Sequence, residues 1–185
     1  MPAIPDEQRL QNSETLRGAI RSIPDFPKPG ILFRDISPLL EDAFLFRSTI
    51  DLLAMECEGM ILSKVVGLDA RGFIFGAALA YKLGVGFVPV RKKGKLPSAT
   101  LSHSYDLEYG SATLEIHCDS IRKGESVIVV DDLLATGGTA GAAIHLLQKL
   151  GAVVAGLLVV IELGFLQGRN ALGETRVKSL VSYTD

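Results

Sequence analysis

Short apolar segments alternate with helical patterns through the middle and the C-terminal part of this chain. Apolar runs at 64–68, 85–91, 125–130 and 153–161 predict strands, and the spacing of apolar residues at 72–83 and 139–150 predicts helices. Parallel strands need a crossover connection, which a helix of this length supplies, and helices on both sides bury both faces of the sheet. The alternation therefore predicts an α/β fold with a central, mostly parallel sheet and helices on both faces. In such sheets ligands bind beyond the carboxyl ends of the strands.

The remaining segments extend this pattern without forming a second domain. Ser13 is a candidate N-cap for a short amphipathic helix, and a further helix is expected around Phe46. The proline-containing segment 24–38 is expected to be ordered but not helical. Residues 92–123 break the rhythm and predict a mobile loop and a strand pair. A length of 185 residues fits one globular unit, so 1–185 is predicted to be a single domain.

Composition excludes several classes of partner. The formal net charge is -2, which gives no global electrostatic reason for binding nucleic acid or an anionic membrane. No window resembles a secretory signal, and the longest apolar run is interrupted by Gly156 and Glu162. Cys57 and Cys118 lack metal-ligand spacing and are expected to be reduced thiols. These features indicate a soluble, cytosolic protein that would hold any anionic ligand in a local site.

Segment 126–139 is the most informative part of the chain. A buried-strand pattern ends in Asp131 and Asp132, and a turn of small residues then opens a helix. Gly137 and Gly138 permit backbone angles closed to other residues, so successive amide groups can converge on one anion. The start of the following helix presents unpaired N–H groups to the same place. Carboxylates repel a bare polyphosphate but accept hydrogen bonds from vicinal hydroxyls, so the segment suits ribose 5-phosphate.

Two common nucleotide motifs do not fit this turn. A Walker P-loop needs a lysine after its last glycine, and a dinucleotide fingerprint needs Gly-x-Gly-x-x-Gly; neither pattern occurs here. The plain structural alternative is a strand-to-helix turn with one aspartate as the helix cap. A single capping residue would satisfy that role, so two acids followed by Thr-Gly-Gly-Thr favour ligand binding.

Several motifs in one order resemble the adenine phosphoribosyltransferases, members of the type I phosphoribosyltransferases. Val-Val-Asp-Asp-Leu-Leu-Ala-Thr-Gly-Gly-Thr at 129–139 resembles their phosphoribosyl pyrophosphate signature. Further matching motifs lie at 24–30, 33–38, 67–73, 91–97 and 105–110, and the resemblance runs from about 23 to 161. It implies the type I fold, with a small N-terminal hood at about 24–40 and a flexible active-site loop. It also implies conversion of adenine and phosphoribosyl pyrophosphate into AMP and pyrophosphate, with Mg²⁺ as cofactor and a homodimer as the assembly.

The resemblance also implies roles for individual residues. The residues assigned to the sugar are Ala135, Thr136, Gly137, Gly138 and Thr139 for the 5'-phosphate, and Asp131 and Asp132 for the ribose hydroxyls. Those assigned to pyrophosphate are Asp69, Ala70, Arg71, Arg91 and Lys95, the last two across a dimer interface. Those assigned to adenine are the Leu32 main chain, Phe33, Arg34 and Leu133.

The catalytic assignments are Glu108, as general acid or base, and Arg71, while Tyr109 would close over the ribose. The metal is expected to bind mainly through ligand oxygens and water, not through a protein cage. A non-proline cis peptide is implied between Asp69 and Ala70, where the family more often has serine at the second position.

Several polar residues have plainer interpretations. Lys93 is expected to be solvated, and Asp35 is expected to form a surface pair with Arg34. Among the histidines, His103 is expected to be a solvated loop residue, and His145 a surface residue of a helix; His117 ends a strand pattern and suggests no role.

Three other functions remain open at this level. The first is the same fold acting on a 6-oxopurine or orotate. The second is a non-catalytic regulator that kept the sugar-phosphate pocket and binds nucleic acid, although no DNA-binding helical module or basic face is apparent. The third is a partner-binding tail formed by residues 168–185.

Overall fold

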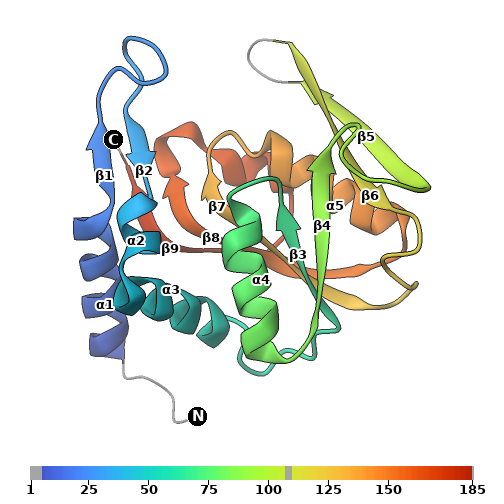
Figure 1. Cartoon of the computed structure of the whole chain (residues 1–185), viewed down its shortest axis with the longest axis horizontal. Helices are drawn as coiled ribbons and strands as arrows, with labels where there is room; N and C mark the ends of the chain where they lie inside the picture. Colours follow the sequence, from blue (N-terminus) through green and yellow to red (C-terminus); the bar gives the residue numbers. More distant parts are fainter. Residues whose placement is uncertain (1–5, 107–109, 185) are drawn as a thin grey trace.

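A computed structural model describes residues 6–106 and 110–184. The centre of the molecule is a seven-stranded sheet (Figure 1) with the order β5-β6-β4-β3-β7-β8-β9. Its strands are β3 (Lys64–Leu68), β4 (Gly86–Lys92), β5 (Thr100–Asp106), β6 (Ser111–His117), β7 (Ser126–Leu134), β8 (Val153–Leu163) and β9 (Val177–Tyr183). The five neighbouring strands β4, β3, β7, β8 and β9 are parallel to one another, whereas β6 is antiparallel to both β4 and β5. The predicted α/β fold with a mostly parallel sheet is confirmed.

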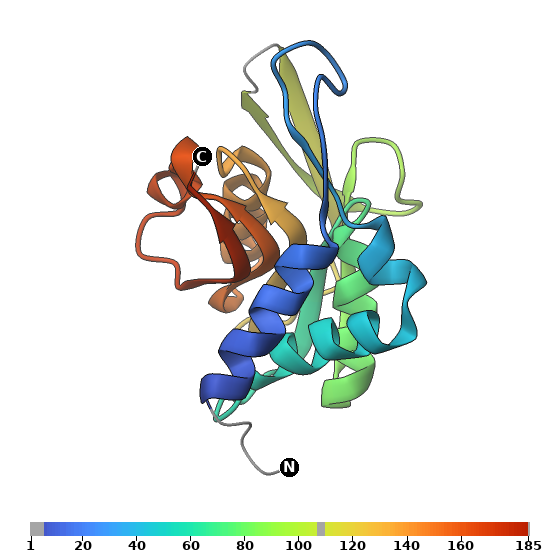
Figure 2. The same ribbon diagram turned by 90° about the vertical axis from the view of Figure 1, so that its left-hand side faces the viewer.

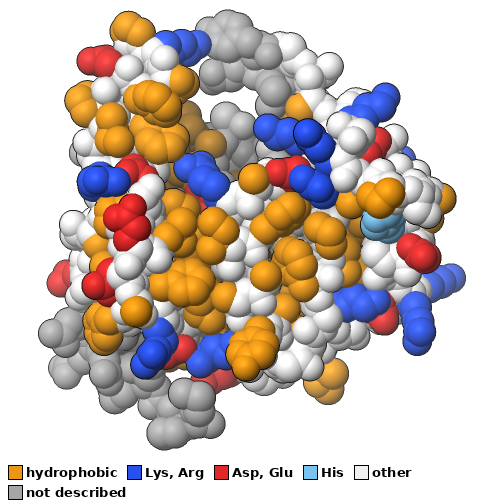
Figure 3. Space-filling view, viewed as in Figure 1, with side chains coloured by type: hydrophobic (Ala, Val, Ile, Leu, Met, Phe, Trp, Pro, Cys, Tyr) orange, Lys and Arg blue, Asp and Glu red, His pale blue; other side chains and the backbone are white. Residues whose placement is uncertain are grey.

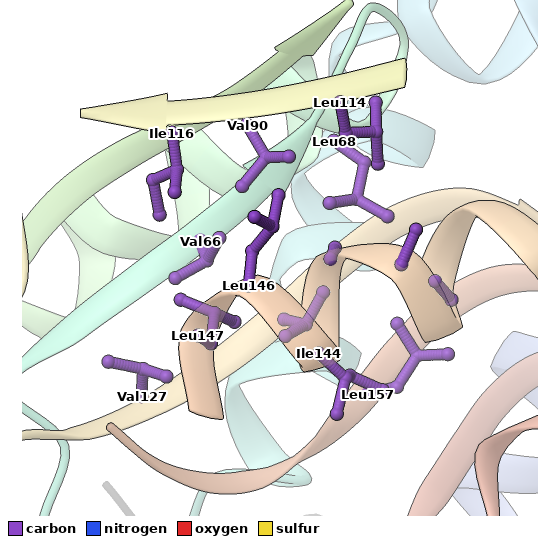
Figure 4. Close-up of a cluster of buried hydrophobic side chains, with 14 of the residues drawn as sticks. Val66, Leu68, Val90, Leu114, Ile116, Val127, Ile144, Leu146, Leu147 and Leu157 are labelled. Carbon is purple, nitrogen blue, oxygen red and sulfur yellow. The ribbon is translucent and has the colours of Figure 1, made fainter. Parts of the chain in front are cut away.

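Helices cover both faces of the sheet. Helices α1 (Asp6–Ala19), α2 (Ser37–Glu41), α3 (Ala43–Met55) and α4 (Gly72–Leu83) contribute buried residues to one apolar cluster. Helix α5 (Gly138–Lys149) packs on the other face, where Ile144, Leu146 and Leu147 meet alternate residues of the strands (Figure 4). Val65 belongs to the first cluster and Val66 to the second, because successive strand residues point to opposite faces. No helix in the described ranges has the length and apolarity needed to cross a membrane.

Element boundaries agree with the sequence pattern in the centre of the chain and differ elsewhere. Strand β3 and helix α4 have the predicted limits. The sequence pattern predicted that this strand ends at residue 130, before the two aspartates. Strand β7 instead continues to Leu134, because Leu133 and Leu134 pair with Ile161 and Glu162 of β8. Asp131 and Asp132 are therefore strand residues, held on the sheet itself.

The N-terminal segments also differ in extent from the prediction. Helix α1 begins at Asp6 and not at Ser13, because residues 7–11 are good helix formers but include only one apolar residue, Leu10, and so show no apolar periodicity. Two short strands, β1 (Arg21–Ile23) and β2 (Phe33–Asp35), pair antiparallel and were not predicted. The loop between them projects beyond the same end of the sheet as the β5–β6 hairpin (Figures 1 and 2). The predicted strand pair within 92–123 is this β5–β6 hairpin.

The C-terminal residues are part of the core and do not form a separate tail. The 3-10 turns η1 (Gly164–Leu166) and η2 (Gly168–Leu172) follow β8, and β9 then pairs parallel with β8. Tyr183 of β9 is buried, with the guanidinium of Arg34 at 3.6 Å from its ring centroid and that of Arg17 at 4.9 Å. Arg17 also donates a hydrogen bond to the Ser182 carbonyl across 165 residues of sequence. Residues 168–184 therefore do not form a separate tail, because they complete the sheet and support the N-terminal segments.

One face of the molecule carries exposed apolar side chains. Phe44 at the start of α3, and Ile74 and Tyr81 on α4, are 68%, 40% and 91% exposed. Figure 3 shows hydrophobic side chains gathered across the middle of this face, over α3 and α4. Exposed apolar side chains gathered on one face are typical of an interaction site.

Candidate active site

A cavity of about 490 Å³ lies beyond the carboxyl ends of β3 and β7. This is the position at which open parallel sheets bind ligands. The turn after β3 contributes Asp69, Ala70 and Arg71, and the end of β7 with the following turn contributes residues 131–140. Lys92, Tyr105 and apolar residues of β6 and β8 line the remaining walls. The cavity thus unites segments that are far apart in the sequence.

The turn between β7 and α5 has the backbone geometry of an anion site. Gly137 occupies the N-cap position of α5 with φ 86° and ψ -6°, a left-handed backbone conformation that residues other than glycine rarely adopt. Helix α5 begins at the next residue and directs its N-terminal amide groups and positive dipole end at the cavity. Thr136 and Thr139 also line the cavity and carry hydroxyl donors.

The C-terminal segment holds this turn from behind. A Cβ on Gly137 would collide with the carbonyl oxygen of Gly168, and a Cβ on Gly168 would collide with that of Ala135. Arg169 fixes the segment by donating two hydrogen bonds, of 2.6 and 2.7 Å, to the carboxylate of Glu162 at the end of β8. The two glycines therefore let two backbone segments touch, and this contact sets the shape of the turn.

The paired aspartates form the acidic wall of the cavity. The Asp131 carboxylate accepts a hydrogen bond of 2.9 Å from the backbone N–H of Asp132. Burial raises the pKa of Asp131 well above its ordinary value, and the neighbouring Asp132 carboxylate raises this pKa further. Burial also raises the pKa of Asp132, against the opposing effect of the Arg71 guanidinium. Two carboxylates held together in this way favour a ligand that can donate hydrogen bonds to them.

Asp132 also has spare capacity to accept hydrogen bonds. Its Oδ2 lies 3.0 Å from Arg71 Nε as an ion pair, but this contact does not have hydrogen-bond geometry. Oδ2 is buried and accepts no hydrogen bond from the described part of the chain. A buried acceptor in this state is costly, so a hydroxyl donor in the cavity would relieve it.

Replacing Asp131 with asparagine is expected to stabilise the fold while weakening the site. A pKa raised above the ordinary 3.8 means that folding favours the protonated acid, so wild-type stability falls as pH rises from about that value toward neutrality. The amide side chain of the variant stays neutral and can still accept from the Asp132 N–H, so the stability advantage of Asp131→Asn should grow from about pH 4 to about pH 7 in denaturant titrations. Binding of ribose 5-phosphate, followed by calorimetry, should weaken about tenfold through loss of a charged acceptor.

The exposed Asp119 provides a matched control for this substitution. Asp119→Asn should change neither the pH dependence of stability nor ligand binding. A stability advantage of Asp131→Asn that is largest in acid, or a variant less stable than wild type at neutral pH, would contradict the electrostatic argument.

The turn after β3 brings Arg71 to the mouth of the cavity. The peptide bond between Asp69 and Ala70 is cis, as the family resemblance implied. Arg71 lies between Asp132, its ion-pair partner, and the ring of Phe33, whose centroid is 5.4 Å from the guanidinium carbon. One guanidinium thus connects the acidic wall to the N-terminal segment. Ala70 lines the cavity without a hydroxyl to offer.

The residues assigned to adenine lie in different environments. Leu133 lines the cavity, while Leu32 is 45% exposed and Phe33 is half-buried. The Arg34 side chain is buried, stacks on Tyr183 and donates a hydrogen bond of 2.5 Å to Ser22 Oγ. The predicted Arg34–Asp35 pair is wrong, because successive residues of β2 point to opposite sides, and Asp35 instead pairs with Arg21 at 2.6 Å.

Comparison with known proteins connects this geometry to a family. Residues 62–181 match the phosphoribosyl transferase domain. An adenine phosphoribosyltransferase from Carboxydothermus hydrogenoformans is 56% identical over 168 residues, which cover 91% of this chain and 99% of the relative. The chain belongs to the adenine phosphoribosyltransferase family.

Solved structures of adenine phosphoribosyltransferases share the fold. The protein from Thermoanaerobacter pseudethanolicus is 51% identical, covers 92% of this chain and 99% of its own, and superimposes with a TM-score of 0.90. The protein from Saccharomyces cerevisiae is 42% identical with the same coverage and TM-score. It was solved in complex with an imino-altritol bisphosphate and adenine. The family predicted from the sequence motifs is confirmed.

Two cations assigned by the family resemblance lie outside the cavity lining. Arg91 Nε is 3.3 Å from Asp69 Oδ2, Arg91 donates a hydrogen bond to the Lys95 carbonyl, and Lys95 itself is exposed. Lys92 lines the cavity instead, although it was not selected from the sequence. The alternation of β4 could have identified it, because Lys92 shares a strand face with the buried Val88 and Val90. The pyrophosphate roles of Arg91 and Lys95 stay predictions.

The β5–β6 hairpin carries two further residues with a place at or near the site, Tyr105 and His103. Glu108 and Tyr109 lie outside the described residues. Tyr105 lines the cavity and was missed, because one aromatic residue in a polar stretch gave no signal of its own. His103 is not simply solvated: the centroid of its ring lies 4.2 Å from that of His145 on α5.

The other residues with plain interpretations lie as follows. His117 ends β6, and Lys93 is exposed. Cys57 is a buried free thiol and Cys118 an exposed one.

Proposed function

We propose that this protein transfers the 5-phosphoribosyl group from phosphoribosyl pyrophosphate to adenine, giving AMP and pyrophosphate. The observation that carries the proposal is one cavity containing the anion-binding turn, two buried carboxylates and the guanidinium of Arg71. A phosphate, a diol and a second anionic group are joined in this order in phosphoribosyl pyrophosphate. Relatives more than 50% identical over nearly their whole length are named for this activity, which supports adenine as the acceptor.

The sugar would be held at both ends. Amide groups of residues 135–139 would bind the 5'-phosphate at the start of α5, and Asp131 and Asp132 would accept hydrogen bonds from the ribose hydroxyls. Arg71, which is paired with Asp132 at the mouth of the cavity, would face the pyrophosphate. Asp69, Ala70 and the nearby Arg91 and Lys95 complete the pyrophosphate side of the proposed site, to which we add Lys92.

The reaction breaks the bond from C1' to a pyrophosphate oxygen and forms a bond from C1' to adenine N9. Positive charge develops on the ribose ring as the first bond lengthens, so the chain's task is to position both reactants and stabilise charge. The bonding pair leaves with pyrophosphate, where cationic side chains would neutralise it. The proton on N9 would pass to the Glu108 carboxylate, which acts as the general base.

Adenine recognition requires an acceptor for its amino group and a donor for the adjacent ring nitrogen. The Leu32 main chain and Arg34 are proposed for this role, with Phe33 and Leu133 packing on the purine faces. The Arg34 side chain is engaged by Tyr183 and Ser22, which supports a contact through its main chain. Tyr109 is proposed to cover the ribose.

Mg²⁺ fits the donor groups available in this cavity. No group of three or more histidine, cysteine, aspartate or glutamate side chains within 6–106 and 110–184 forms a metal cage. The two carboxylates can instead hold a metal's water shell and the sugar hydroxyls to which it binds. When bound, Mg²⁺ would supply positive charge to the pyrophosphate oxygens.

A homodimer is proposed as the working assembly. The exposed apolar side chains of α3 and α4, Phe44, Ile74 and Tyr81, support a second copy as the partner that covers this face. The predicted contribution of Arg91 and Lys95 across the interface depends on this assembly. Sedimentation at the mass of a single 19.8 kDa chain would rule it out.

Product analysis with a panel of bases tests the proposed function. The protein is incubated with Mg²⁺, phosphoribosyl pyrophosphate and, separately, adenine, hypoxanthine, guanine or orotate. Adenine should give AMP with release of pyrophosphate, and the other bases should react at least about a hundredfold more slowly, because unpaired polar groups in the base site are costly. A 6-oxopurine or orotate product would replace the acceptor. Binding of the sugar without turnover of any base would favour a regulatory protein.

A further inference from the structure

Tyr105 contacts the anion-binding turn directly. Its hydroxyl lies 3.0 Å from Thr139 Oγ1, within hydrogen-bond distance, and both residues line the cavity. Thr139 belongs to the first turn of α5, whereas Tyr105 belongs to β5, so the contact joins two elements across the cavity wall.

The face of β5 that carries Tyr105 is fixed against α5 at a second point. Leu101, His103 and Tyr105 are alternate residues of the strand and are less exposed than Ser102 and Ser104 between them. His103, the nearest residue before the tyrosine on this face, meets His145 of α5 with the ring centroids 4.2 Å apart. The position of the tyrosine hydroxyl is therefore set by the packing of the strand on the helix.

When an anion is bound, the number of protons on the two hydroxyls determines which of Tyr105 and Thr139 donates to the other. Threonine has one hydroxyl proton, and a phosphate oxygen that accepts it leaves Thr139 able only to accept from Tyr105. A phenol is a better donor than an aliphatic alcohol because its hydroxyl is far more acidic. The pair can thus direct the Tyr105 proton to Thr139 and the Thr139 proton into the cavity.

We propose that Tyr105 is a positioning residue that orients the Thr139 hydroxyl for donation to the 5'-phosphate. This inference rests on the proposed function for the identity of the anion. Tyr105 acts through Thr139, so its contribution belongs to binding of the sugar phosphate and not to recognition of the base.

The test compares Tyr105→Phe with Ser104→Ala. Both substitutions remove one hydroxyl from β5, but Ser104 pairs with Thr113 Oγ1 at 2.9 Å in an exposed position outside the cavity lining. Tyr105→Phe should raise the dissociation constant of ribose 5-phosphate and the KM for phosphoribosyl pyrophosphate about threefold to tenfold, the usual range for one hydrogen bond. The KM for adenine should stay within about twofold, and Ser104→Ala should match wild type in every measurement.

A double-mutant cycle with Thr139→Val separates positioning from general stability. If Tyr105 acts through Thr139, adding Tyr105→Phe to Thr139→Val should cause no further loss of ribose 5-phosphate binding. Full additivity, or wild-type binding by Tyr105→Phe, would overturn the inference. Calorimetric binding needs no turnover, so failure to make AMP would refute the proposed function while the cycle still tests the pair. A wild-type protein that does not bind ribose 5-phosphate would refute both.

Discussion

Replacing Gly137 with alanine is expected to weaken AMP binding by about a hundredfold or more. Two effects combine at this position. The backbone has φ 86°, which costs an alanine about 1–2 kcal/mol, and the added Cβ would collide with the Gly168 carbonyl oxygen. Gly168 cannot simply retreat, because it is packed against the Ala135 carbonyl and followed by Arg169, which is paired with Glu162. The turn itself must then move, and its amide groups lose their common target.

Gly124 offers a matched control for this experiment. It has the same φ of 86°, but a Cβ there would meet nothing within 4 Å. Gly124→Ala should therefore lower the free energy of unfolding by about 1 kcal/mol without changing AMP affinity. Isothermal calorimetry with AMP and thermal unfolding of both variants provide the measurements. Equal affinities for Gly137→Ala and Gly124→Ala would refute the role of the Gly137–Gly168 contact.

Replacing Glu108 with alanine is expected to lower kcat by about a hundredfold or more, the usual contribution of a general acid or base. The affinity for phosphoribosyl pyrophosphate should change little, because the proposed phosphate, hydroxyl and pyrophosphate contacts come from other segments. Glu108 lies outside the described residues, and in the sequence it falls between Asp106 and Ser111. The paired residues Asp106 and Ser111 end the two strands of a hairpin whose β5 strand packs on α5, beside the cavity.

The exposed Glu174 serves as the control for Glu108. Glu174→Ala should leave kcat and both KM values unchanged. Single-turnover AMP formation, measured beside equilibrium binding of phosphoribosyl pyrophosphate, separates chemistry from affinity. A loss of affinity as large as the loss of rate would assign Glu108 to sugar binding and remove its role as the base.

The central part of the fold could be predicted from the sequence because local pattern and tertiary environment agree there. Strand β3 is apolar on both sides and is buried between parallel neighbours, and α4 has a continuous apolar pattern. The extension of β7 through Asp131 and Asp132 could not be predicted, because carboxylates are poor strand formers. Their strand conformation comes from pairing with β8, which is a tertiary contact. The β1–β2 hairpin is likewise too short for periodicity to detect.

The candidate site was predictable where its residues are consecutive. The turn at 135–139 and the pair of aspartates form one motif, and the cavity contains both. Lys92, Tyr105 and Gly168 were not identified, because their relation to the site depends on strand faces and on packing between distant segments. Gly168 is the clearest case: nothing in the neighbouring sequence reveals that its backbone touches the phosphate turn.

The contact of Tyr183 with Arg17 and Arg34 has a consequence for biosynthesis. Arg17 reaches the ribosome exit long before Ser182, to whose carbonyl it donates, since 165 residues separate them. Helix α1 and the β1–β2 hairpin therefore lack their contacts with β9 until that last strand has been translated. Such non-local closure slows folding and leaves apolar surface uncovered meanwhile. Nascent chains stalled before β9 should consequently be far more sensitive to protease in the segment from α1 to β2 than released protein.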